Sequence, residues 1–200
     1  ADCVVTAVSI GGAAYWGEPY RSEVEIPLKY GVQQTVADTI GVGGVFRFLR
    51  TADEHLNFAK DMERFCPDAL MLNYTNPMCM LTWLHSVGSS IQNVGLCHSV
   101  QGTTKKLAEG VGVDYGQVSY LVAGINHQAW VLRLRRGNED LYPKLRAAVE
   151  THESFAEDRV RVEMMRQFGY FVTESTRHNA EYLPYFHRTK ELRDYYGVGE

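Results

Sequence analysis

Cysteine, histidine and asparagine side chains stand just after apolar segments at three points of this sequence. Cys97 and His98 follow "IQNVGL", His127 lies in "AGINHQAW", and Asn76 stands in "NYTNPM". A thiolate and a neutral imidazole are both ligands for divalent transition metals. Cys97 and His127 are therefore candidates for a shared metal site, although their separation matches no standard ligand spacing.

Each of these residues also has a purely structural interpretation. An Asn before a Pro is ordinary chemistry for the start of a helix, so Asn76 is a candidate cap. Cys97 can be a small buried hydrophobe, His98 a surface residue, and His127 a hydrogen-bonded core histidine. Position favours the chemical interpretation, because the carboxyl ends of parallel strands open onto one crevice.

The first half of the chain alternates short apolar segments with helical patterns. Residues 2–12, 69–77 and 91–97 are apolar runs typical of buried strands. Apolar residues recur at helical spacing between Gly41 and Pro67, and residues 78–90 and 103–112 supply two further helical segments. This order predicts an α/β fold with a parallel sheet covered by helices on both faces.

The pattern changes at about Tyr120, where a second lobe begins. Residues 120–136 alternate as an antiparallel or edge strand does, and residues 142–150 and 157–169 are typical of helices. No internal repeat, low-complexity tract or long linker separates the two parts, so we expect packed lobes. We place the domain boundary between residues 119 and 120, with domains 1–119 and 120–200.

Composition excludes several classes of function. The chain has 200 residues, a net charge of -4 and a pI near 6.0, with scattered Lys and Arg, which argues against a nucleic-acid partner. No apolar run approaches the roughly 20 residues of a membrane span, and no signal peptide is recognisable, so we expect no membrane partner and a cytoplasmic location. The four cysteines form no CxxC pair and indicate neither a disulfide framework nor a structural zinc site. We expect most of them to be buried thiols.

Six segments together carry a family resemblance over nearly all 200 residues. They are, in order, "ADCVVTAVSIGG", "KYGVQQTVADTIGVGGVFRFLRT", "MLNYTNPM", "VGLCHSVQGT", "AGINHQAW" and "GYFVTESTRHNAEY". The chain closely resembles glycoside hydrolase family 4, in particular its α-galactosidase branch. The resemblance implies a partial Rossmann-like parallel sheet, as in lactate and malate dehydrogenases, followed by the start of an α+β lobe. It also implies NAD and a divalent metal, usually Mn²⁺, as cofactors.

The resemblance assigns roles to five residues. Cys97 and His127 match the family's metal ligands, and Asn76 matches the Asn that lies against the substrate and the nicotinamide. Gly11 is the expected second contact with the cofactor. His98 follows the metal-binding cysteine, where the family's residue varies with the substrate, and the Cys-His-Ser-Val stretch implies an unphosphorylated α-galactoside.

The family's reaction oxidises the C3 hydroxyl with NAD, removes the C2 proton, eliminates the C1 substituent, adds water and returns the hydride. Related branches take the base from the segment that aligns with "FVTEST", where Glu174 is the nearest ionisable residue. A solvated carboxylate or a partner for Arg177 is the structural alternative for Glu174, and Tyr182 and Tyr185 are reserve candidates for the base. His98 is a second catalytic candidate, because an imidazole can assist the leaving oxygen.

Two other functions remain open. A plain NAD-dependent dehydrogenase on the same fold would place an arginine, such as Arg47 or Arg50, against a substrate carboxylate. A non-catalytic remnant would persist as a binding or oligomerisation module. The family's N-terminal GxGS-type turn and C-terminal portion are absent from the sequence, so we expect the central part of a longer enzyme that forms a homo-oligomer and takes a small-molecule glycoside.

Overall fold

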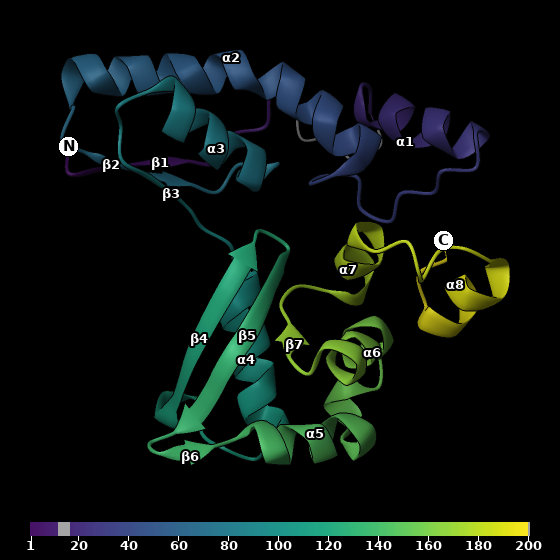
Figure 1. Cartoon of the computed structure of the whole chain (residues 1–200). Coiled ribbons are helices and arrows are strands. Elements are labelled where there is room, and N and C mark those ends of the chain that lie inside the picture. The colour runs from purple at the N-terminus through teal and green to yellow at the C-terminus, as the bar shows by residue number, and fades with distance from the viewer. Residues whose placement is uncertain (12–16, 200) are drawn as a thin grey trace. The chain divides into compact units, whose positions relative to one another are not determined.

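The computed structural model describes residues 1–11 and 17–199, which form two compact units, Ala1–Cys97 and His98–Glu200. Each unit has its own β-sheet (Figure 1). None of the helices within the described residues combines the length and the apolar composition that a membrane span needs.

The first unit contains a three-stranded parallel sheet in the order β1-β2-β3. Its strands are β1 (Cys3–Thr6), β2 (Leu70–Asn73) and β3 (Asn93–Gly95). Helix α2 (Gly41–Phe65) connects β1 to β2, and α3 (Met78–Gly88) connects β2 to β3, while α1 (Tyr20–Lys29) precedes α2. The three predicted strands and the predicted helices after Gly41 and Met78 are confirmed, and the parallel α/β fold with them, whereas α1 was not predicted.

The expectation that helices cover both faces of this sheet is wrong for the described residues. Figure 1 shows α2 and α3 on the same side of the strands. Successive right-handed crossovers that step in one direction across a sheet place their helices on one face. The core therefore lies between that face and α2, around Met62, Met71 and Ile91, whereas Val5 on the other face is 58% exposed.

The second unit is built on an antiparallel sheet, as predicted for the chain after Tyr120, but the single strand expected over residues 120–136 is divided into two by a turn at residues 126–127. Strands β4 (Val118–Ile125) and β5 (Gln128–Arg136) form a hairpin, and β6 (Glu139–Asp140) and β7 (Phe171–Val172) pair with β5. The helices of this unit are α4 (Ser99–Gly110), α5 (Tyr142–Thr151), α6 (Arg159–Phe168), α7 (Thr176–Tyr182) and α8 (Lys190–Tyr196).

The core of the second unit gathers the inward-facing side chains of β5 and β7 with those of α5. Val131, Leu134, Leu145 and Phe171 are all fully buried. The hydroxyl of Tyr142 donates to the Val131 carbonyl and accepts from the Phe171 amide, so it joins the two strands to α5. Helix α4 packs on α5 and β4 in this unit. The division of the chain into domains at Tyr120 stays a prediction.

The cysteines differ from the expectation of buried thiols. Cys3 is exposed, and Cys66, Cys79 and Cys97 are only partly buried. Cys3 lies at the start of β1 and Cys97 just after β3, while Cys66 follows the end of α2 and Cys79 lies in the first turn of α3. Partial burial raises the pKa of the Cys79 thiol.

Candidate active site

His127 occupies the tight turn between β4 and β5. Ile125 pairs with Gln128, so only Asn126 and His127 form the loop. The φ of His127 is +63°, in the left-handed region that glycine normally supplies in hairpin turns. The imidazole is 5% exposed. A buried imidazole in a strained turn is a costly arrangement, which marks this position as a functional candidate.

Glu174 follows β7 and has a left-handed backbone of its own, with a φ of +74°. Its carboxylate Oε1 lies 3.9 Å from the Nε2 of His127, and the side chain is only 18% exposed. The preceding residue, Thr173, is tied to β5 on both sides: its amide donates to the Ala129 carbonyl at 2.8 Å, and its hydroxyl accepts from the Ala129 amide at 3.1 Å. The strand pairing thus brings Glu174 to the hairpin turn.

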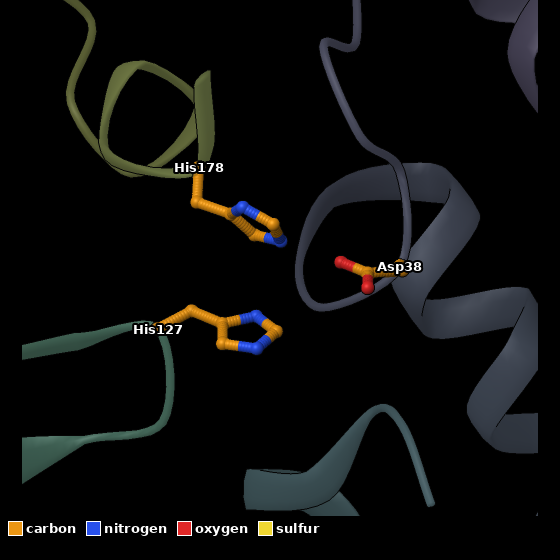
Figure 2. Close-up of side chains that lie close together, drawn as sticks. All are labelled: Asp38, His127 and His178. Carbon is orange, nitrogen blue, oxygen red and sulfur yellow. The ribbon is translucent and has the colours of Figure 1, made fainter. Parts of the chain in front are cut away.

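His178 on α7 completes the cluster, and the sequence interpretation missed it. Figure 2 shows the imidazoles of His127 and His178 side by side; their ring centroids lie 4.3 Å apart in an edge-on arrangement. The Nδ1 of His178 lies 3.0 Å from the hydroxyl of Ser175 and 3.7 Å from the Glu174 carboxylate. Ser175 caps α7 by accepting from the His178 amide. The serine cap three residues before the histidine was the signal in the sequence that could have revealed it.

The cluster of His127, Glu174 and His178 therefore combines one carboxylate with two imidazoles in a largely buried place. A carboxylate held in this way can accept a proton from a substrate, and an imidazole nitrogen can ligate a divalent metal. Both activities need side chains that the fold holds in one orientation. The contact of Ser175 with His178 and the pairing of Thr173 with Ala129 provide this orientation.

In the first unit, Asn76 lies beyond the carboxyl end of β2. Its Oδ1 accepts from the Met78 amide at 3.3 Å, so it stabilises the start of α3, and its Nδ2 donates to Asp38 at 3.1 Å. Asp38 also accepts from the Thr39 hydroxyl at 2.7 Å. The sequence interpretation missed Asp38, whose only signal was an acidic residue shortly before the glycines at the start of α2.

The glycines of "GVGG" explain how the Asp38 turn is packed. A Cβ on Gly43 would lie 2.5 Å from the Ala37 carbonyl oxygen, and one on Gly44 would lie 2.6 Å from the Thr39 carbonyl carbon. Ala37 itself has a φ of +60°. The first turn of α2 can approach Asp38 this closely only because it lacks side chains there.

The remaining predicted site residues occupy strand and helix ends. Cys97 is partly buried just after β3, and His98 is an exposed residue at the start of α4. Gly11 has a φ of +92° and lies against the side chain of Arg50. Cys97 belongs to the first unit and His127 to the second, and their shared metal stays a prediction.

The reserve candidates show different environments. The hydroxyl of Tyr182 donates to the Asn126 carbonyl at 2.9 Å, which supports the His127 turn, whereas Tyr185 is 57% exposed. Arg50 forms an ion pair with Glu23, a side chain that is itself almost buried. An arginine engaged in this way is a poor anchor for a substrate carboxylate, which weakens the dehydrogenase alternative.

Comparison with known sequence families shows to which protein family the chain belongs. The profile described as "Family 4 glycosyl hydrolase" matches residues 1–113, and that of the "Family 4 glycosyl hydrolase C-terminal domain" matches residues 122–198. The chain belongs to family 4 of the glycosyl hydrolases. The two matched ranges contain every residue of the candidate site described above.

Individual members of family 4 extend this relationship. The chain is 47% identical over 187 residues to an α-galactosidase of Bacillus subtilis, covering 93% of this chain and 43% of that protein. The crystal structure of LplD from Bacillus subtilis superposes with a TM-score of 0.82 at 27% identity, over 96% of this chain and 49% of the other.

A more distant structure shares the fold. The 6-phospho-β-glucosidase of Thermotoga maritima, solved with manganese, NAD⁺ and glucose-6-phosphate, gives a TM-score of 0.74 at 21% identity, over 98% of this chain and 45% of the other. The chain spans less than half the length of the curated relatives it matches.

Proposed function

We propose that this chain supplies the substrate- and metal-binding part of an NAD- and divalent-metal-dependent glycosidase that acts on α-galactosides. The observation that carries the proposal is the cluster of His127, Glu174 and His178, in which two residues hold strained backbones and bring a carboxylate to an imidazole. The 47% identity to an α-galactosidase and the Cys-His-Ser-Val stretch support the α-galactoside as the substrate class.

The chemistry of the donors fits a divalent transition metal. His127 offers an imidazole held by a rigid turn, and Cys97 offers a thiol at a strand end. Imidazole and thiolate ligate divalent transition metals in general, and a carboxylate such as that of Glu174 is the ligand type that suits Mn²⁺. A distant relative of the same fold was solved with manganese and NAD⁺. NAD would supply the acceptor for the hydride from C3, and a divalent metal would supply the positive charge that polarises the resulting C3 carbonyl and so makes the C2 proton more acidic.

The residues of the chain then have separate tasks. Glu174 accepts the C2 proton, since its carboxylate is oriented by the Thr173 pairing and sheltered from bulk water. His178 lies beside that carboxylate and stabilises the charge it carries before the transfer. His98 contacts the sugar or the leaving oxygen, and Asn76, held by Asp38, orients the substrate against the nicotinamide.

An assay with four substrates tests the proposal. The full-length protein that contains this sequence is incubated with NAD, Mn²⁺ and a thiol, and with the p-nitrophenyl α-galactoside, α-glucoside or α-glucuronide, or with a 6-phospho-glucoside. We expect release of p-nitrophenol from the α-galactoside without net accumulation of NADH. Hydrolysis of the phosphorylated substrate alone would overturn the substrate class, and net NADH production would support a dehydrogenase instead.

A further inference from the structure

Asn179 on α7 is fully buried, so its side chain offers no surface to a substrate. Its Nδ2 donates at 2.9 Å to the Thr173 carbonyl and at 2.9 Å to the Ser175 carbonyl. These two carbonyls flank Glu174 on either side. A single side-chain amide therefore bridges the left-handed residue that carries the carboxylate.

The orientation of this amide follows from chemistry. Both of its partners are carbonyl oxygens, so only the NH₂ group can face them. The Oδ1 of Asn179 is buried and has no hydrogen-bond partner among the residues that the structure describes. A buried polar atom without a partner destabilises the fold, and an apolar residue would avoid that loss. The position therefore uses an asparagine for its two donors.

Neighbouring contacts make the turn rigid on both sides of Glu174. Thr173 is 1% exposed and pairs twice with Ala129, two residues after His127. The guanidinium of Arg161, itself buried, donates to the Val172 carbonyl at 3.2 Å, which fixes the end of β7. A glutamate does not hold a φ of +74° unless its surroundings impose it.

We infer that Asn179 is a positioning residue, which locks the left-handed turn at Glu174 and so aims the carboxylate at the reacting carbon. The inference rests on the proposed function, in which Glu174 is the base. Asn179 touches neither substrate nor cofactor in this role. It acts through the backbone conformation of Glu174, the residue that contacts the substrate.

The experiment compares Asn179→Ala and Thr173→Val with Asn138→Ala, a matched change at an exposed turn, in the full-length protein. Thr173→Val keeps the side-chain volume and removes the hydroxyl that accepts from Ala129, so it serves as a second variant if Asn179→Ala folds poorly. We expect both site variants to lower kcat by about 10- to 100-fold, with KM and bound Mn²⁺ changed less than about twofold. Asn138→Ala should behave as the parent protein does.

Two further measurements separate positioning from general damage. With a substrate deuterated at C2, the kinetic isotope effect on kcat should rise in Asn179→Ala and Thr173→Val, because proton removal becomes more rate-limiting. An unchanged isotope effect together with an unchanged kcat would overturn the inference.

A crystal structure of Asn179→Ala should show that Glu174 has left the left-handed region or moved away from His127. If Glu174 keeps both its φ and its 3.9 Å separation from His127, the inference is wrong whatever the activity. If the parent protein hydrolyses none of the glycosides, the proposed function fails, and this crystal structure still decides whether Asn179 holds the turn.

Discussion

Strained residues lie at the chemically important positions of this chain. Within the described residues, Ala37, His127 and Glu174 are the non-glycine residues with a positive φ. His127 and Glu174 belong to the cluster with His178 in the second unit, and Ala37 adjoins Asp38 in the first. A left-handed backbone costs an L-residue roughly 1–2 kcal/mol. Strained residues of this kind are concentrated at functional sites, where a side chain must point in one direction even at the expense of stability. These positions therefore indicate where side-chain orientation is important.

Removal of either proposed metal ligand should abolish the metal-dependent activity. We expect Cys97→Ser and His127→Ala to lower the Mn²⁺ content of the full-length protein and to reduce turnover at least about 100-fold, because each removes a proposed ligand of the metal that would polarise the substrate. Metal analysis of the purified variants, with the exposed His152→Ala as control, makes the measurement. Full manganese occupancy with normal turnover would contradict the assignment.

A second pair of histidines affects stability instead of catalysis. His55 on α2 and His85 on α3 are fully buried, and the Nδ1 of His55 lies 3.1 Å from the Nε2 of His85. Burial, together with the charge of His85, lowers the pKa of His55 to about 4, and burial lowers the pKa of His85. Both side chains are therefore neutral in the folded protein near pH 7.

This pair should make the first unit sensitive to acid. An unfolded histidine has a pKa near 6.5 and binds a proton that the folded form rejects until about pH 4, so the free energy of unfolding falls as the pH drops through this range. For His55 alone the loss is on the order of 3 kcal/mol. Denaturant unfolding at pH 7.5, 6, 5 and 4 measures it.

The double variant His55→Phe/His85→Leu is expected to flatten this pH dependence, and the exposed His152→Gln to leave it unchanged. An equal slope in the double variant and the parent would show that other groups cause the acid sensitivity.

At the scale of elements, the first turn of α2 decides how Asp38 and Asn76 are held. Gly44 packs against the backbone of Thr39, and a backbone atom cannot move aside as the end of a flexible side chain can. The glycine pattern that opens this helix is therefore a packing requirement of the site.

Gly44→Ala should lower the free energy of unfolding by about 1–3 kcal/mol and reduce activity, because the 37–39 turn must shift away from the helix. Gly102→Ala in α4 is the matched control. A Cβ at Gly102 meets no atom within 4 Å, so this change should be neutral or stabilise the protein by up to about 1 kcal/mol. Thermal unfolding of both variants makes the comparison, and equal destabilisation would contradict the packing argument.

At the scale of the whole molecule, the described chain has separate apolar cores. One surrounds Met71 in the first unit, and another surrounds Leu134 and Phe171 in the second. A core mutation should therefore have its largest effect within its own unit.

Leu134→Ala tests this expectation. Loss of a fully buried leucine should cost about 2–5 kcal/mol, and amide hydrogen exchange should accelerate more in β5 and β7 than in β2. The exposed Leu132→Ala on the same strand is the control and should change the exchange rates little. Equal acceleration in β2 and β5 would contradict the prediction.

Much of this protein could be predicted from the sequence alone. The alternation of short apolar runs and helical patterns predicted the parallel sheet, the antiparallel strand after Tyr120 and two of the helices that follow it, because periodicity is a local property. The turn that divides this strand into the β4–β5 hairpin was not predicted. The short motifs also identified the family and indicated Asn76, Cys97, His127 and Glu174, since motif residues stand close together along the chain.

Only the tertiary structure revealed the contacts between distant segments. The uncovered face of the first sheet depends on the strand order, which determines the side to which each crossover helix turns. His178, Asp38 and Asn179 lie within segments that carry the family resemblance, but their roles depend on contacts with other residues that the sequence does not show. Backbone strain at His127 and Glu174 was likewise invisible in the sequence, because it is the surrounding packing and hydrogen bonds that impose a left-handed conformation on an ordinary residue.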